Sequence, residues 1–153
     1  MKKYLFILTL LFGFTATSLS CAQSKTTQKE KFQSTYNEMK ALVQSKDYKF
    51  VGDFVYNNKK REKLDSATNN IAVNQSEVSG FASALYAKDE VINVNGKITN
   101  YNVNFDDDAQ EIAIEFTVDD IKVYIDIKPN GNAFLAIKSS VNNITQVGKV
   151  QSR

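Results

Sequence analysis

The chain has 153 residues, of which 42% are hydrophobic and 24% charged, with no histidine and a single cysteine, Cys21. Its 19 basic and 17 acidic side chains nearly cancel, so it lacks the basic excess of nucleic-acid-binding proteins, and we expect no nucleic-acid partner. The chain lacks histidine, the commonest general base and metal ligand, and it cannot form a catalytic Cys/His pair. We therefore expect no enzymatic activity, no cofactor and no metal site.

The N-terminus has the pattern of an export signal. Lys2 and Lys3 precede an apolar run from Tyr4 to Phe14, and small residues follow, as in secretory signal peptides. The run is shorter than the roughly 20 residues that a membrane-spanning helix needs. Residues 1–20 are therefore predicted to be a signal peptide. Without the two lysines, 17 basic and 17 acidic residues are left, so the mature chain is neutral.

Cys21 directly follows the predicted signal, and two processing routes compete there. In the first, the thiol carries a diacylglyceryl group through a thioether, and Ser20 before Cys21 resembles the small residue of a bacterial lipoprotein signal. In the second, an ordinary signal peptidase cuts after Ala22 and releases a soluble periplasmic protein that begins at Gln23. We favour lipidation of Cys21, because the only cysteine of the chain stands where an anchor would be.

Residues 21–26 are polar after the cysteine and are predicted to be a tether. At about 3.3 Å per residue, so short a segment would hold a folded domain within some 20 Å of the bilayer. The lipid anchor would make the membrane a partner, and we expect the protein to be membrane-anchored in the cell envelope, facing the periplasm or at the outer membrane.

Residues 27–150 are predicted to form a single domain that begins with a helix. Thr27 and Glu30 have capping-box spacing, and apolar residues then recur at helical intervals. These residues are Phe32, Tyr36, Met39 and Val43. They predict one amphipathic helix, roughly residues 27–46, whose apolar stripe packs on the domain's own sheet. A membrane or partner surface is the alternative use of this stripe.

After Asp47 the apolar period changes to two. Tyr48, Phe50, Phe54 and Tyr56 alternate, which predicts a strand with these four side chains on one face. A loop at 57–60 would close this strand. Residues 71–73 predict a second short strand, and residues 80–86, with mixed periodicity, predict an irregular crossing.

The C-terminal half alternates most regularly. Four segments, 98–105, 111–118, 121–127 and 133–137, place aliphatic or aromatic residues at every second position and are separated by turn sequences. They predict an antiparallel meander with one aliphatic face, while the other face is mainly polar but includes Tyr124 and Phe134. A last strand with Val141, Ile144, Val147 and Val150 is expected to bend near Gly148.

The predicted fold class is therefore α+β and mainly β, with one N-terminal amphipathic helix packed on a curved antiparallel β-meander.

Several segments together resemble a known family. They are Tyr48-Lys49-Phe50, the segment from Gly80 to Tyr86, the strand at 112–118, the turn from Ile127 to Ala133, and Gly148. The chain resembles the Bacteroidota family catalogued as domain of unknown function 4251 over about residues 30–150. The resemblance implies a Gram-negative cell-envelope setting, and it implies no activity, substrate or catalytic residue.

Two further sites are candidates. Phe81, Leu85 and Tyr86 are predicted to line a ligand cleft if the curved sheet encloses a cavity, as small barrels do. Asp65-Ser66-Ala67 resembles the tripeptide at which Bacteroidota attach O-linked glycans to exported proteins, which makes Ser66 a candidate glycosylation site. The acidic run 106–108 with Glu111 is interpreted as a hairpin turn rather than a calcium site, because the EF-hand spacing is missing.

From the sequence we expect an exported cell-envelope lipoprotein without enzymatic activity, which binds another protein or a component of the envelope. The alternative is a carrier of a small apolar ligand, held in a cavity inside the curved sheet.

Overall fold

The computed structural model describes residues 28–85, 91–140 and 143–153, and Cys21 and Thr27 lie outside them. The chain divides into two compact units, Met1–Ser34 and Thr35–Arg153. Residues 28–34 of the first unit are helical, and the second unit begins with helical residues 35–45. All the strands described belong to the second unit.

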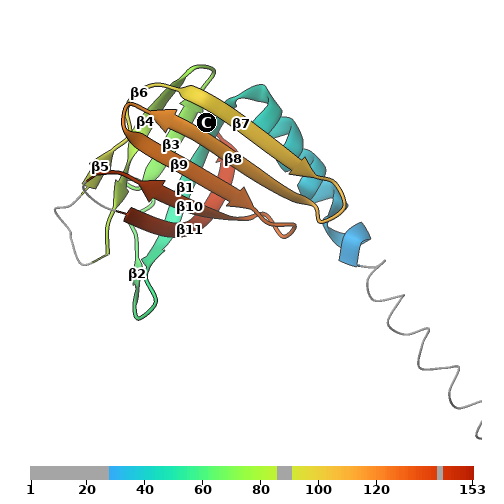
Figure 1. Ribbon diagram of the computed structural model, residues 1–153. Coiled ribbons are helices and arrows are strands. Elements are labelled where there is room, and N and C mark those ends of the chain that lie inside the picture. The colour runs from blue at the N-terminus through green and yellow to red at the C-terminus, as the bar shows by residue number, and fades with distance from the viewer. Residues whose placement is uncertain (1–27, 86–90, 141–142) are drawn as a thin grey trace, which may run out of the picture. The chain divides into compact units, whose positions relative to one another are not determined.

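The strands form one curled antiparallel sheet (Figure 1). Its order is β5-β4-β3-β1-β11-β10-β9-β8-β7, with β2 paired to β1 and β6 paired to β4. The last strand therefore lies in the middle of the sheet and joins its two halves. The strands are β1 (Asp47–Tyr56), β2 (Arg61–Lys63), β3 (Asn70–Asn74), β4 (Glu77–Ser83), β5 (Val91–Asn93), β6 (Gly96–Lys97), β7 (Thr99–Asp106), β8 (Glu111–Val118), β9 (Ile121–Ile127), β10 (Asn132–Lys138) and β11 (Asn143–Ser152).

The core lies on the inner face of the curled sheet. In β8, β9 and β10 every second side chain is buried, as the alternation predicts. These side chains are Ile112, Ile114, Phe116, Val118, Val123, Ile125, Ile127, Ala133, Leu135 and Ile137. The predicted fold class is confirmed: a helix and a mainly β, curled antiparallel sheet.

The helical residues of the second unit pack on this core, as the apolar stripe predicts. Tyr36 and Val43 are buried, and Met39 and Leu42 contact the core. The helix is also bound to the β7–β8 turn, because the Tyr36 hydroxyl donates to Asp107 Oδ1 at 2.6 Å and Lys40 Nζ lies 2.6 Å from the same oxygen. The pKa of Tyr36 is raised to about 12, mainly because the hydroxyl is buried and to a smaller extent because it donates to Asp107.

The first strand differs from its prediction in the second half. Its pairing with β11 shifts between Gly52 and Phe54, which marks a β-bulge at Asp53. Beyond the bulge Val55 is buried, whereas Phe54 and Tyr56 are half-buried. The prediction that Phe54 and Tyr56 share the core face with Tyr48 was wrong, because one extra residue reverses the faces of all residues after it.

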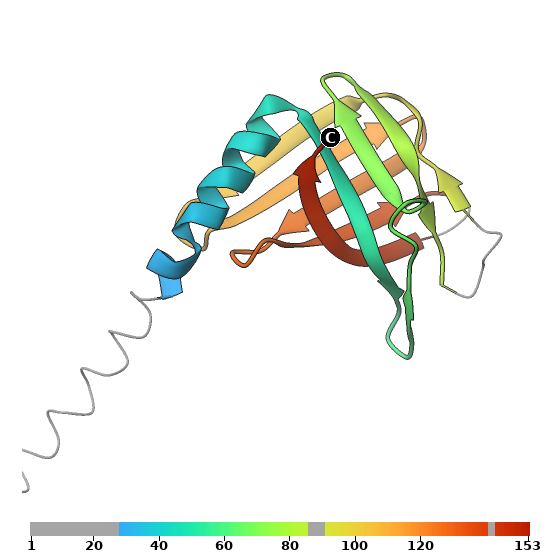
Figure 2. The same ribbon diagram turned by 180° about the vertical axis from the view of Figure 1, so that it is seen from behind.

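Glycine permits the close crossing of β1 and β11 next to this bulge. Gly52 lies opposite Gly148, and a Cβ at Gly148 would stand 1.9 Å from the carbonyl oxygen of Val51. Figure 2 shows β11 bending sharply as it crosses β1, in agreement with the predicted bend. The predicted strand residues Ile144, Val147 and Val150 all lie in β11, where Ile144, Gln146, Gly148 and Val150 are buried and Val147 is half-buried on the opposite face. Val141 lies outside the described residues.

Residues 77–83 form a regular strand where an irregular crossing is predicted for 80–86. Val78, Gly80 and Ala82 of β4 are buried and alternate with exposed neighbours. Two of these three buried residues, Gly80 and Ala82, are small. At Gly80 a side chain is excluded, because a Cβ there would lie 2.0 Å from the carbonyl oxygen of Asn70 on β3. The hydrophobic period is therefore hidden by the close approach of β3 and β4, and the irregular crossing was a wrong prediction for 80–83.

Replacing Gly148 by alanine tests the strand crossing. We expect Gly148→Ala to lower the free energy of unfolding by about 3 kcal/mol or more, because the new methyl group meets backbone atoms that cannot move away. The matched control is Gly52→Ala, whose Cβ would meet the side-chain oxygen of Gln146 at 2.5 Å and should cost less. Urea unfolding measures both, and an equal or smaller loss for Gly148→Ala would contradict this account.

Alkaline unfolding tests the bond between the helix and the turn. Because the pKa of Tyr36 is raised to about 12 in the folded chain, its contribution is complete below pH 10 and is lost as the pH rises toward 12. The hydrogen bond should make Tyr36→Phe about 1–2 kcal/mol less stable than the natural protein at pH 7. Burial also raises the pKa of Tyr48 and Tyr101, and both proteins share that effect. Urea titrations should show the gap narrowing above pH 10, and a constant gap would oppose this assignment.

Candidate functional site

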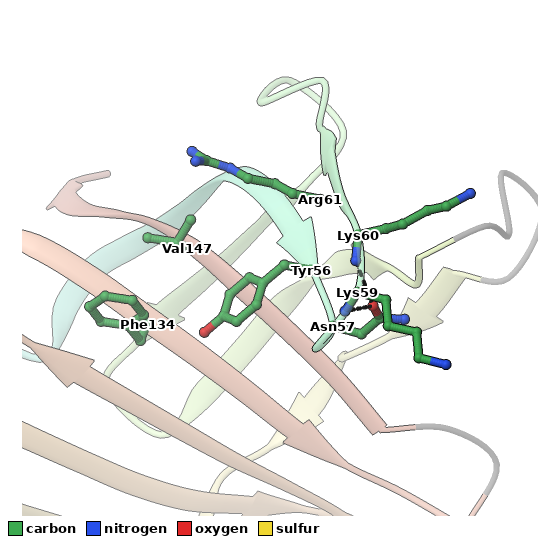
Figure 3. Close-up of a pocket in the computed structure, with 7 residues that line it drawn as sticks. All are labelled: Tyr56, Asn57, Lys59, Lys60, Arg61, Phe134 and Val147. Atoms are coloured by element: carbon green, nitrogen blue, oxygen red, sulfur yellow. Dashed lines mark hydrogen bonds between the residues drawn. The ribbon is translucent and has the colours of Figure 1, made fainter.

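A hollow of about 530 Å³ lies on the outer face of the sheet, where the β1–β2 hairpin stands beside β10 and β11 (Figure 3). It is an open depression whose lining is aromatic on one side and cationic on the other. The lining residues are Tyr56, Asn57, Lys59, Lys60, Arg61, Phe134 and Val147.

The apolar side of the hollow follows from strand register. Val147 of β11 is paired with Phe54 of β1 and with Phe134 of β10, so the three side chains form one row across the outer face. Tyr56 follows Phe54 on the same face, and its ring points toward Phe134 in Figure 3. The bulge at Asp53 is what brings Phe54 and Tyr56 to this face. All four side chains are half-buried.

The cationic side is built by the tight β1–β2 loop. The side-chain oxygen of Asn57 accepts the backbone N–H groups of Lys59 and Lys60, both at 2.9 Å, and the N–H of Asn57 donates to the carbonyl of Lys60 at 3.0 Å. This turn fixes the backbone from which Lys59, Lys60 and Arg61 project. Figure 3 shows the two lysine side chains extending away from Phe134.

Arg61 is the best-positioned cation of the hollow. It is paired with Tyr56 across the β1–β2 ladder, and its guanidinium carbon lies 3.5 Å from the ring centroid of Phe54. Stacking on an aromatic face orients a guanidinium and leaves its N–H groups available at the edges. Glu62 is paired with inward-facing Val55, so its carboxylate belongs to the opposite face. The lining thus contains three cations and no carboxylate.

A buried polar cluster of Gln146, Asn69 and Ser83 lies on the inner face of the sheet, opposite the hollow. Gln146 Nε2 donates to the carbonyl of Ser83 at 3.1 Å and lies 3.4 Å from Asn69 Oδ1, which also accepts the N–H of Ser83 at 2.8 Å. Gln146 and Asn69 are both buried. Among the residues described, no buried side-chain nitrogen or oxygen is without a hydrogen-bond partner. The cluster is therefore satisfied internally, and we assign it a structural role.

The predicted cleft residues are not among those that line the hollow. Phe81 is 47% exposed on β4, Leu85 is partly buried against the core, and Tyr86 lies outside the described residues. Their role in ligand binding stays a prediction. Tyr56 and Val147 were not predicted as site residues, since the bulge that turns Tyr56 outward has no local signal in the sequence. Phe134 did give a signal, because it is an aromatic residue on the mainly polar face of the predicted meander.

The acidic residues of the β7–β8 turn are engaged within the fold. Asp106 accepts the backbone N–H groups of Asp108 and Ala109, Asp107 binds Tyr36 and Lys40, and Glu111 binds Lys128 at 2.7 Å. In the described parts of the chain, no three His, Cys, Asp or Glu side chains form a group that could hold a metal ion. The acidic run therefore works as a turn and as an attachment point for the helix.

Ser66 lies in an exposed turn between β2 and β3. Asp65 holds the turn, because its side-chain oxygen accepts the N–H of Ala67 at 3.0 Å and its carbonyl accepts the N–H of Asn69 at 3.0 Å. The side chain of Ser66 is thus accessible to a modifying enzyme, and its glycosylation stays a prediction. No helix within the described residues is long and apolar enough to cross a membrane.

Comparison with known proteins gives a family and a fold. The family model described as "Domain of unknown function (DUF4251)" matches residues 30–150. The crystal structure of a DUF4251 family protein from Bacteroides eggerthii DSM 20697 is similar, with a TM-score of 0.62 and 18% identity over 76% of this chain and 87% of that one. At this identity the likeness concerns the fold alone. No curated protein matches the chain.

Glycosylation at Ser66 is testable by mass. In protein purified from its native host we expect a mass above that of the mature polypeptide by a glycan, and Ser66→Ala should remove the increment because the acceptor hydroxyl is gone. Thr68→Ala, which removes another exposed hydroxyl of the same turn, should keep it. Identical masses after allowance for the Ser66→Ala substitution would refute modification at this site.

Proposed function

This chain belongs to the family described as domain of unknown function (DUF4251), and on that premise we propose that it is an exported cell-envelope lipoprotein that binds an envelope component or another protein without catalysing a reaction. The observation that carries the binding role is the open hollow on the outer face, with its aromatic and cationic lining. Export and anchoring are supported by the signal pattern of residues 1–20 and by Cys21 directly after it.

The membrane setting fits the chemistry of the N-terminus. The predicted anchor of a mature lipoprotein carries two or three acyl chains, and two or more give stable membrane attachment where one chain does not. The polar tether 21–26 is short, so the domain would meet components of the envelope near the bilayer surface. The neutral mature chain has no general attraction for anionic surfaces, which leaves selectivity to local features such as the hollow.

Binding rather than catalysis is supported by the groups in the hollow. Its titratable side chains are a tyrosine, two lysines and an arginine, and the lining has no carboxylate or imidazole to act as a general base. A binding site instead needs apolar contact area and a few oriented polar groups, which Tyr56, Phe134 and Arg61 provide. This supports a binding protein.

The alternative of an apolar-ligand carrier has weaker support. Such a ligand would occupy the inner face of the curled sheet, where Tyr48, Phe50 and Phe116 are each fully buried. Tyr48 also uses its hydroxyl there, 3.2 Å from the hydroxyl of Tyr101. Large side chains that already contact one another leave less room for a guest than the outer hollow does.

Intact mass of the protein from its native membrane fraction tests the proposal. We expect the mass of a chain that begins at Cys21 and carries acyl groups, because the thiol and the new N-terminus are the acceptors. Cys21→Ala should leave the membrane fraction, as a soluble or an unprocessed form. Ser24→Ala, a change within the same tether, should keep both the mass increment and the location.

A different N-terminus and location would contradict the proposal. A natural protein that begins at Gln23 and is recovered free in the periplasm would overturn the anchor.

A further inference from the structure

We infer that the hollow on the outer face is a binding site for an acidic saccharide, a sugar chain or sugar headgroup that carries carboxylate or phosphate. The inference deepens the proposed function and takes the envelope setting from it. The class of ligand follows from the residues that line the hollow.

The apolar side of the hollow is suited to sugar rings. Tyr56, Phe134 and Val147 present half-buried side chains next to one another across three strands. The C–H groups of one face of a pyranose ring carry small positive charges and pack on the negative face of an aromatic ring. Such packing needs ring faces on an accessible surface, which an open depression supplies and a closed cavity would not.

The cationic side selects for negative charge. Arg61 is held over Phe54 at 3.5 Å, and a guanidinium binds a carboxylate or phosphate through paired N–H groups. Lys59 adds a second charge at the rim of the hollow, from the loop whose backbone Asn57 holds, and its side chain extends away from Phe134 (Figure 3). The carboxylate of Asp126, opposite Phe134 on β9, belongs to the side of the hollow away from the hairpin. The hairpin side therefore favours an anionic group on a ligand whose rings lie over Tyr56.

An acidic peptide fits this surface less well. Peptides that bind to sheets gain most of their affinity by pairing their backbone with an open strand edge. The strands that carry Phe134 and Val147 are interior: β11 is paired with β1 and β10, and β10 is paired with β9 and β11. Among the described strands beside the hollow, β2 pairs with β1 alone, but it is only three residues long and offers a short edge. Over the aromatic rings a ligand therefore contacts side chains, as the hydroxyl and C–H groups of a saccharide do.

A bare membrane surface also fits poorly. Proteins that dock on bilayers insert exposed apolar or aromatic side chains at protruding tips. The tip of the β1–β2 hairpin is Asn57-Asn58-Lys59-Lys60, which contains no apolar residue, and the aromatic rings lie inside the hollow behind it (Figure 3). A flat bilayer would meet the charges and leave the rings uncovered.

Titration calorimetry with the full mature protein tests the inference, whether or not the protein proves to be anchored. The probes are an oligogalacturonate, a neutral oligogalactan of the same length, and poly-glutamate. We expect the oligogalacturonate to bind at least about tenfold more tightly than either control, since only it combines rings with charge. Tyr56→Ala and Arg61→Gln should each weaken it by about tenfold.

Two changes elsewhere on the same face are matched controls. Tyr124→Ala removes an aromatic ring and Lys122→Gln an exposed cation from β9, away from the hollow, and both should change the affinity by less than about twofold. The weakening by Arg61→Gln should shrink at high salt, because ions screen an exposed charge pair. Equal losses for the β9 variants, or poly-glutamate binding as tightly as the oligogalacturonate, would overturn the assignment to this hollow.

Vesicles separate the two sources of an acidic sugar. Binding to the free oligogalacturonate assigns a polysaccharide, whereas binding only to vesicles that contain a glucuronosyl diacylglycerol assigns a lipid headgroup; both outcomes support the inference. Equal binding to vesicles of phosphatidylglycerol, which has no sugar ring, would refute it. The anchor experiment on Cys21 is independent of these titrations, so failure of one proposal is distinguishable from failure of the other.

Discussion

The crossing of β1 and β11 is the constraint on which the rest of the structure depends. Gly52 and Gly148 face each other there without side chains, and a Cβ at Gly148 would overlap the backbone of β1. The crossing seats the last strand in the middle of the sheet, between the N-terminal and C-terminal strands. The bulge at Asp53 beside it bends β1 and reverses the faces of the residues that follow. The same irregularity thus closes the core and creates the outer hollow.

The structure also separates charges that the composition balances. Asp107 binds Lys40 of the helix, Glu111 binds Lys128, and both carboxylates serve the fold. The lysines and arginine of the β1–β2 hairpin instead border the hollow, whose lining has no carboxylate. A chain whose 19 basic and 17 acidic side chains nearly cancel therefore carries a local positive site. This placement would give the proposed binding surface its selectivity without a general attraction for anions.

Sequence periodicity predicted the elements whose packing is regular. The strands β8 to β10 of the meander were found because nearly all their inner residues are large, apolar and at every second position. The strand β4 was missed because Gly80 and Ala82, which face the core, are too small to show a hydrophobic period. Gln146 hides the period of β11 for the opposite reason: it is polar yet buried, since Asn69 and Ser83 satisfy its amide. Of the candidate site, only Phe134 and the basic loop were visible in the sequence.

By itself the sequence determined the export pattern, the candidate anchor at Cys21, the mainly β fold with its packed helix, and the family. Each of these depends on residues that are neighbours along the chain or that repeat with a fixed period. Only the tertiary structure decided which face Phe54 and Tyr56 occupy and that they meet Val147 and Phe134. The physical reason is that a bulge is set by the pairing of two strands from opposite ends of the domain, and such pairing leaves no periodic trace in either strand alone.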